Sequence, residues 1–333
     1  MLEIDGSAGG GQIVRTALSL SALSGTAVRI ESVRGDRPTP GLGAQHLAAV
    51  EAAAALCSAT VEGGEEGSET LVFRPEAVEA DDVSVDVGTA GSIALVFDTL
   101  LPLAVALDEP ATVTVTGGTD VKWAPLVSYL QRVKLPLVAE AGLDADIAVD
   151  RRGFYPAGGG RATLTLRPSE LSPLSLTERG ALRRIEVYST ATEELADAEV
   201  ADRQAAAVAT GLDADVSVGT TTSYVEAHSP GSSLLLVAVY ENTRAGFSAL
   251  GEAGKPSEDV AAEAVEAFHR FQEGAAAVDR HLADQSLVFL ALGGGAVLAP
   301  EVTDHVETNR GVIEAFGYDL AVSDGDGGVV IEG

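Results

Sequence analysis

A histidine between two acidic residues is the most reactive group near the end of this chain. His305 stands in the stretch TDHVETN, residues 303–309, of a sequence that has five histidines. A neutral imidazole is nucleophilic near pH 7, so this residue is a candidate for covalent catalysis. The same pattern also fits a solvated residue at the start of a helix, and His305 alone does not establish a site.

Glycine-rich turns and paired arginines add groups that suit phosphates. GSAGGGQIVR, from Gly6, predicts a turn that opens a helix, and backbone N–H groups in such a turn can approach a phosphate. RGDRPTPG presents Arg34 and Arg37, and arginine can hold a phosphate with two parallel hydrogen bonds. RRGFYPAGGG predicts a further turn, and GFSALGEAGKPSEDV, with Lys255, fits either a flexible surface loop or a ligand contact. Each stretch by itself also has a purely structural explanation.

Composition excludes several classes of protein. The chain has 333 residues, 46% of them hydrophobic and 21% charged, which is long and apolar enough for one large core or two domains. Its N-terminus lacks the basic start of a signal peptide, and its apolar runs are too short or too interrupted to cross a bilayer. Cys57 is the single cysteine, so no disulfide forms within the chain. We therefore expect a soluble, cytoplasmic protein.

The net charge of −29 disfavours phosphate-rich partners in dilute salt, because like charges repel. The lysines are Lys122, Lys134 and Lys255, and all other basic residues are arginines. This balance is typical of a halophilic protein in a very salty cytoplasm, where the Debye length is about 3 Å at 1 M salt. Short arginine–phosphate contacts survive such screening, so the charge does not exclude a phosphate-bearing substrate.

The elements that must position these groups are repeated along the chain. GSAGGGQIVRTALSLSALSG begins at Gly6 and GTAGSIALVFDTLLPLAVAL at Gly88, and each is G-[ST]-A-G followed by a long apolar helix. A second predicted helix follows each, with Pro40 or Pro125 near its start. Runs such as ATVTVTG and ATLTLRP predict strands. The repeating unit is therefore strand, helix, strand, helix, strand, strand, in an α/β (α+β) protein.

A third copy is predicted from ADQSLVFLALGGGAVLAP to the end of the chain, although it lacks the G-[ST]-A-G start. We expect a core made of residues 1–179 and 273–333, interrupted by an inserted domain at 180–272. The inserted segment is expected to open with the loop RPSELSPLSLTERGA. If the copies are quasi-equivalent, His305 begins a second helix, where copy one has Arg34 and Arg37 and copy two has Lys122. Helix dipoles favour anions at that place.

Eight stretches in this order resemble the RNA 3′-terminal phosphate cyclases: GGGQIVRTALSLS, RPTPGLGAQHLAAV, GTAGS, GGTD, GFYPAGGG, GFSALGE, LADQ and TDHVETN. The resemblance covers nearly the whole chain. It implies a core of three repeats, each a four-stranded sheet with two helices, and a smaller inserted α/β domain. This agrees with the repeats and the insertion read from the residues themselves.

The resemblance also implies an activity for His305. The matching histidine of the family attacks the α-phosphorus of ATP, carries AMP, and passes it to an RNA 3′-phosphate, which then closes to a 2′,3′-cyclic phosphate. The implied partners are ATP, with Mg²⁺ or Mn²⁺, and RNA 3′-phosphate ends, with no membrane, for a monomer or homodimer. The motifs imply a nucleotide-binding set of Gln12, Arg15, Pro125, His281, Asp284 and Gln285, and a phosphate- or RNA-binding set of Arg34, Arg37 and Gln45.

Some positions depart from the family pattern. Ala8 stands where members commonly have a metal-binding glutamate, Ala44 replaces an arginine, Asp98 replaces a glutamine, and His281 replaces a tyrosine. The metal ligands are therefore unknown, and the carboxylates of Glu3, Asp5 and Asp98 are alternatives for the missing one.

Two other functions remain alternatives. A non-catalytic cyclase-like ribosome-assembly protein would lack the histidine. The repeated unit also resembles enolpyruvyl transferases, but their substrate-binding pattern is absent from this sequence.

Overall fold

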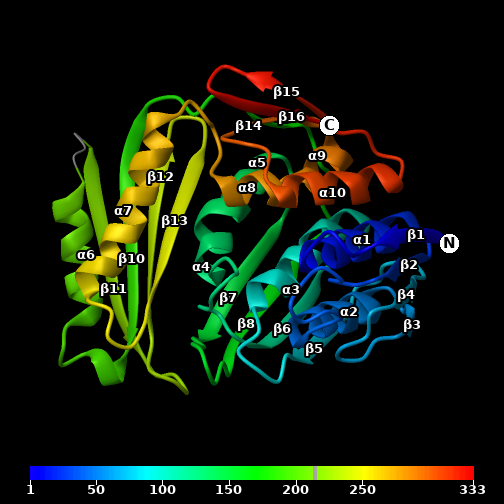
Figure 1. Cartoon of the computed structure of the whole chain (residues 1–333), viewed down its shortest axis with the longest axis horizontal. Coiled ribbons are helices and arrows are strands. Elements are labelled where there is room, and N and C mark those ends of the chain that lie inside the picture. Colours follow the sequence, from blue (N-terminus) through cyan, green and yellow to red (C-terminus); the bar gives the residue numbers. More distant parts are fainter. Residues whose placement is uncertain (213–215) are drawn as a thin grey trace.

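Four-stranded sheets are the framework of the protein. The computed structural model describes residues 1–212 and 216–333, and within them the named strands form four sheets of four strands each, covered by helices (Figure 1). Three of these sheets share one strand order and one pattern of strand directions. The predicted α/β class with three repeats and an inserted unit is confirmed.

The first unit follows the predicted strand–helix pattern. Its elements are β1 (Leu2–Asp5), α1 (Gly11–Ser24), β2 (Val28–Glu31), α2 (Ala44–Leu56), β3 (Thr60–Glu62) and β4 (Leu71–Arg74). The sheet order is β1-β2-β4-β3, with β1 and β2 parallel and the other pairs antiparallel. Helix α1 ends at Gly25, whose φ of 65° is the left-handed conformation that glycine adopts without strain at a helix C-terminus. This turn returns the chain directly into β2.

The second unit repeats the arrangement. Its elements are β5 (Asp82–Asp86), α3 (Ile93–Leu100), η1 (Leu101–Ala106), β6 (Ala111–Gly117), α4 (Val127–Tyr129), η2 (Leu130–Lys134), α5 (Leu135–Glu140), β7 (Ala145–Arg151) and β8 (Gly160–Leu166). The order β5-β6-β8-β7 is that of the first sheet. Ser92 caps α3 by accepting a hydrogen bond from the Leu95 N–H at 3.3 Å. The second helix is continuous through a π-helical turn at η2, a feature that is frequent near functional sites.

The third unit is split by the inserted segment. Its elements are β9 (Leu174–Leu176), α8 (Arg280–Gln285), α9 (Leu287–Gly293), β14 (Gly295–Ala299), α10 (Asp304–Ala315), β15 (Ala321–Gly325) and β16 (Gly328–Glu332). Strand β9 pairs in parallel with β14, so the order β9-β14-β16-β15 completes the same sheet. The interpretation of RPSELSPLSLTERGA as a loop is therefore wrong for its central residues. A strand of three residues is too short to show an alternating pattern.

A fourth sheet and two long helices lie between β9 and α8. They comprise β10 (Leu182–Thr192), η3 (Glu193–Leu195), α6 (Val200–Gly211), β11 (Ser217–Val225), β12 (Ser232–Tyr240), β13 (Arg244–Gly251) and α7 (Ser257–Glu273). GFSALG belongs to β13, so the surface-loop interpretation of that stretch is wrong, and the exposed turn is residues 252–254 after it. The boundaries at 179/180 and 272/273 stay a prediction.

Strand β12 is buried on both faces and joins two hydrophobic clusters. Leu234 and Leu236 pack with α6 and α7, whereas Leu235 and Val237 belong to the large cluster shared by the three repeats. Alternation along a strand points successive side chains to opposite faces, which explains this division. Figure 1 shows this sheet at one end of the long axis, with β13 nearest to α4.

No helix among the described residues is both long and apolar enough to cross a membrane.

Candidate functional site

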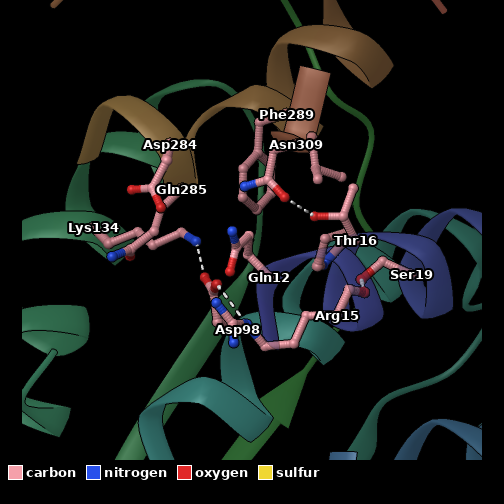
Figure 2. Close-up of a pocket in the computed structure, with 12 residues that line it drawn as sticks. Gln12, Arg15, Thr16, Ser19, Asp98, Lys134, Asp284, Gln285, Phe289 and Asn309 are labelled. Atoms are coloured by element: carbon pink, nitrogen blue, oxygen red, sulfur yellow. Dashed lines mark hydrogen bonds and ion pairs between the residues drawn. The ribbon is translucent and has the colours of Figure 1, made fainter. Parts of the chain in front are cut away.

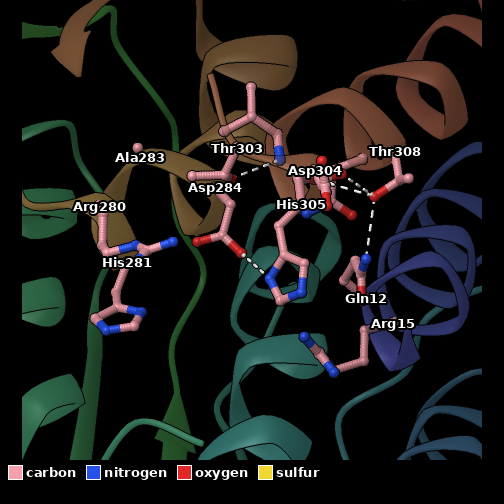
Figure 3. A network of polar contacts seen from close by, with 12 residues as sticks. Gln12, Arg15, Arg280, His281, Ala283, Asp284, Thr303, Asp304, His305 and Thr308 are labelled. Atoms are coloured by element: carbon pink, nitrogen blue, oxygen red, sulfur yellow. Dashed lines mark hydrogen bonds and ion pairs between the residues drawn. The ribbon is translucent and has the colours of Figure 1, made fainter. Parts of the chain in front are cut away.

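His305 lies in the first turn of α10, at the position that the repeats predict. The Thr303 hydroxyl caps this helix by accepting a hydrogen bond from the Val306 N–H at 3.2 Å. The His305 side chain is 49% exposed, and its Nδ1 lies 3.3 Å from Asp284 Oδ2 (Figure 3). An Nδ1–H donated to this carboxylate leaves the Nε2 lone pair free. The imidazole is thus accessible and has one ring nitrogen available as a nucleophile.

Asp284 comes from α8, a short helix that Asp279 holds in place. The buried Asp279 carboxylate accepts hydrogen bonds from the N–H groups of His281 (2.9 Å) and Leu282 (3.0 Å). It also accepts one from the Tyr129 hydroxyl at 2.8 Å and one from the Gly246 N–H at 2.9 Å. One side chain therefore joins the second repeat, the inserted sheet and α8. Motif matching did not single out Asp279, because its partners are distant in sequence.

Helix α1 packs against α10 through paired polar groups. Gln12 Nε2 donates to Thr308 Oγ1 at 3.0 Å, and the Thr16 hydroxyl donates to Asn309 Oδ1 at 2.8 Å (Figures 2 and 3). These contacts bring residues from the two ends of the chain together. The glycine turn before α1 therefore lies next to the helix that carries His305.

A buried charge network lies beneath this contact. Lys134, whose side chain is only 1% exposed, forms an ion pair with Asp98, and Arg15 Nε lies 4.0 Å from the same carboxylate (Figure 2). Burial lowers the pKa of Arg15, and the carboxylates of Asp98 and Asp284 partly offset this. Asp98 was one alternative for the missing metal ligand, and the structure instead pairs it with two cations.

A small cavity of about 20 Å³ lies among these residues, enough for a water and far less than a nucleotide needs. Two buried polar atoms have no hydrogen-bond partner in the part of the chain that the structure describes, and they are Arg15 Nε and Gln285 Oε1. The cavity brings together residues that the motifs predicted and others that they missed. The lining is Gln12, Arg15, Thr16, Ser19, Asp98, Pro102, Lys134, Asp284, Gln285, Val288, Phe289 and Asn309.

The loop between β2 and α2 brings arginines to the glycine turn. Arg34 has a φ of 56° and donates from Nη1 to the Gly41 carbonyl at 2.8 Å, which shapes the loop. Arg37 is exposed, and a Cβ built on Gly10 would lie 3.3 Å from its Nη2, so its guanidinium reaches the turn before α1. Gln45 turns toward the second repeat, where its Oε1 accepts from the Ser92 N–H at 3.1 Å.

His46 lies under this turn as a neutral, buried imidazole. Its Nδ1 accepts a hydrogen bond from the Gly43 N–H at 2.9 Å. Burial, with the charges of Arg15 and Arg34, lowers the pKa of His46 to about 3. A Cβ at Gly11 would lie 2.2 Å from His46 Nε2, so that position must be glycine for the helix to start here. His46 was part of a matched motif but was not predicted as a site residue.

Two predicted residues form no hydrogen bond with His305 within residues 1–212 and 216–333. Pro125 is in the loop before α4. His281 is exposed on α8, and the centroid of its ring lies 6.4 Å from that of the Tyr129 ring, in an edge-on arrangement. In Figure 3, Asp284 lies between His281 and His305.

The donor set does not fit a resident divalent cation. No cluster of three or more histidine, cysteine or acidic side chains suited to a metal occurs among the described residues. Asp98 is held by Lys134 and Arg15, and Asp5 accepts a hydrogen bond from the Ser7 N–H at 2.9 Å. Ala8, where the family pattern has a carboxylate, is exposed and has no donor atom in its side chain.

Comparison with known proteins agrees with this arrangement. A family model described as RNA 3′-terminal phosphate cyclase matches residues 7–319. The chain is 52% identical to the RNA 3′-terminal phosphate cyclase of Halobacterium salinarum over 342 residues, covering 99% of each chain. It is 43% identical to the protein of that name from Archaeoglobus fulgidus over 324 residues, covering 95% of each. This chain therefore belongs to the RNA 3′-terminal phosphate cyclase family.

Proposed function

We propose that this protein is an ATP-dependent RNA 3′-terminal phosphate cyclase that converts an RNA 3′-phosphate to a 2′,3′-cyclic phosphate and releases AMP and pyrophosphate. The observation that carries the proposal is the half-exposed His305 at the start of α10, with Asp284 3.3 Å from its Nδ1. A nucleophile needs an accessible lone pair and a fixed tautomer, and this pair supplies both. The names of the relatives at 43–52% identity support the same reaction.

Three displacements at phosphorus make up the proposed reaction. His305 Nε2 attacks the α-phosphorus of ATP, the bond to the bridging oxygen breaks, and pyrophosphate leaves. An oxygen of the RNA 3′-phosphate then attacks the same phosphorus, and the phosphorus–nitrogen bond breaks. Finally the 2′-hydroxyl attacks the 3′-phosphorus, gives its proton to solvent, and displaces AMP. Asp284 holds the Nδ1 proton, which stabilises the positive charge that develops on the ring.

Phosphate groups are assigned to the residues around the glycine turn. Arg15 and Gln12 lie at the start of α1, and Arg34 and Arg37 lie in the loop beside it. Backbone N–H groups at two helix N-termini, α1 and α10, add further donors that favour anions. Gln45, Pro125, His281 and Gln285 are proposed to complete the nucleotide and RNA sites.

A divalent cation, Mg²⁺ or Mn²⁺, is proposed to accompany ATP rather than to reside in the protein. It would be held mainly by phosphate oxygens and water, as Mg²⁺ commonly is in nucleotide sites. We further infer a cytoplasmic location and a high-salt setting. The single cysteine and the net charge of −29 support this inference.

The test is covalent labelling. Incubation with ATP labelled in the α-phosphate should leave label on the denatured wild-type chain, whereas His305→Ala and His305→Asn should retain none and make no cyclic phosphate. His269→Ala, in α7 of the inserted segment, is the matched control and should label normally. Label on His305→Ala would contradict the assigned nucleophile. An unlabelled, well-folded wild-type chain would favour the non-catalytic alternative.

A further inference from the structure

Two large aromatic side chains stand in solvent on adjoining loops. Trp123 is 97% exposed and Tyr155 71% exposed, and apart from Met1 these are the large apolar side chains exposed among the described residues. Backbone hydrogen bonds tie the loops together, because the N–H groups of Thr119 and Asp120 donate to the Gly153 carbonyl at 2.9 and 3.2 Å. Neither ring is needed to fill the core. Their exposure therefore calls for another role.

The backbone at Trp123 is held in a conformation that costs free energy. Its φ of 60° lies in the left-handed region, which a bulky side chain rarely adopts. A ring that is 97% exposed gains almost nothing from packing to offset this strain. Strained residues of this kind concentrate at ligand-binding sites. The loop holds the indole outward, where a ligand can reach both of its faces.

The position of Trp123 in the repeat also points to a ligand. It lies in the loop from β6 to α4, which joins the second strand of its unit to the second helix. The same loop of the first unit carries Arg34 and Arg37, and that of the third leads into the first turn of α10, which carries His305. Arg34 shares the positive φ, at 56°. Two of the three quasi-equivalent connections thus present groups proposed to act on phosphates, and the remaining one carries Trp123.

The chemistry of the patch favours stacking over ionic binding. Lys122 is paired with Glu252 at 2.9 Å and Arg152 with the buried Asp120 at 3.2 Å, whereas the exposed Arg151 donates from Nε to the Gly159 carbonyl at 2.7 Å. Two of these three cations are thus paired with a carboxylate. An indole stacks on any nucleobase, because every base has a flat π face, and unpaired bases of single-stranded RNA are free to do so. Stacking is also insensitive to the salt that screens charge contacts.

We propose that the Trp123 indole is a stacking platform for a nucleobase of the single-stranded RNA that carries the 3′-phosphate. This inference rests on the proposed cyclase function and assigns part of its RNA site. The phosphates are then bound near His305, while Trp123 stacks on a base without selecting which base it is. Sequence-tolerant binding of RNA ends is the expected consequence.

The protein's only tryptophan makes the contact directly observable. A short oligoribonucleotide with a 3′-phosphate, added without ATP, should quench the intrinsic fluorescence saturably. A sugar–phosphate chain of equal length without bases should not. ATP alone should also leave the emission unchanged after correction for absorption. No quenching by the oligoribonucleotide, or equal quenching by ATP alone, would overturn the proposal, since the latter places Trp123 at the nucleotide.

A matched pair of variants separates stacking from backbone strain. Trp123→Gly removes the ring and suits the left-handed backbone, so it should fold at least as well as the wild type. It should raise the RNA concentration for half-maximal cyclisation at least fivefold. Trp123→Phe keeps an aromatic face and should stay within threefold of wild type. Wild-type RNA dependence in Trp123→Gly, or an equal loss in both variants, would refute stacking.

The two proposals fail in different ways. AMP uptake in the absence of RNA should match the wild type in both variants. A wild-type chain that takes up no AMP would refute the cyclase mechanism, whereas the fluorescence titration requires no turnover and still tests the base contact.

Discussion

Replacing Asp98 by asparagine should lower the free energy of unfolding, because it leaves two largely buried cations, Lys134 and Arg15, without their carboxylate. Lys134 is 1% exposed and Asp98 14%, and Arg15 lies 4.0 Å from the same carboxylate. Two unit charges about 4 Å apart interact by about 4 kcal/mol at an effective dielectric constant of about 20. Removing one partner of a buried pair costs about 3–5 kcal/mol. The asparagine oxygen can still accept a hydrogen bond from Lys134, so we expect about 3 kcal/mol.

The assay is urea unfolding at fixed high monovalent salt, followed by circular dichroism. The free energy of unfolding of Asp98→Asn is compared with that of Lys134→Met and of the double variant. The double variant should be more stable than Asp98→Asn alone, because the unpaired buried ammonium is gone and Arg15 still feels Asp284. A coupling free energy of at least about 1.5 kcal/mol is expected from the cycle.

An exposed ion pair provides the matched control. Arg74 and Glu62 lie 2.6 Å apart with both side chains well exposed, so Glu62→Gln should cost less than about 1 kcal/mol. If Asp98→Asn costs no more than Glu62→Gln, or if the two core changes are simply additive, the network is not a buried ionic contact. The argument that Asp98 holds Arg15 in place by charge would then be wrong.

Three further outcomes are expected. Arg37→Ala should slow cyclisation at least tenfold, about 1.4 kcal/mol of transition-state stabilisation, with an unchanged unfolding midpoint. Unchanged kinetics at saturating RNA and ATP would show that Arg37 is a solvated surface residue. The pKa of His46 is lowered to about 3 in the folded protein. Between about pH 6.5 and pH 3 the imidazole is therefore protonated in the unfolded chain but neutral in the folded one, so the free energy of unfolding decreases as the pH falls through this range. His46→Asn should flatten the stability curve over that window by up to about 1.4 kcal/mol per pH unit, measured by urea unfolding, and parallel curves would show that His46 titrates normally. Ala8→Glu should lower the divalent-cation concentration needed for self-adenylylation at fixed salt, whereas an unchanged requirement would place the metal away from the glycine turn.

Local patterns were sufficient for most of the fold. The recurrence of G-[ST]-A-G before an apolar helix, at Gly6 and Gly88, predicted two units that prove to have one strand order. The third unit was found without that motif, because the strand and helix patterns do not depend on it. Strand β9 was missed, since a strand of three residues has no readable periodicity and its partner β14 lies beyond the inserted segment. Its pairing is a property of the folded chain alone.

The candidate site divides in the same way. Motif matching predicted Arg15, Asp284 and His305 as site residues, and the structure places Asp284 beside His305 and Arg15 in one cavity lining with Asp284. It did not find Lys134, which looks like a surface lysine in the stretch LQRVKLPL. A lysine is buried only where a carboxylate offsets its desolvation, and that carboxylate comes from Asp98, on a different helix.

Residue types and spacing alone therefore predicted the repeated unit and the family, and they proposed His305 as the nucleophile, because these features are encoded over short stretches. Tertiary structure decided which groups meet. Asp284 faces His305, Gln12 donates to Thr308, and Asp98 is paired instead of open to a metal. The physical reason is that such contacts join distant segments of the chain, and their energy depends on burial and distance. Neither quantity exists until the three units have packed together.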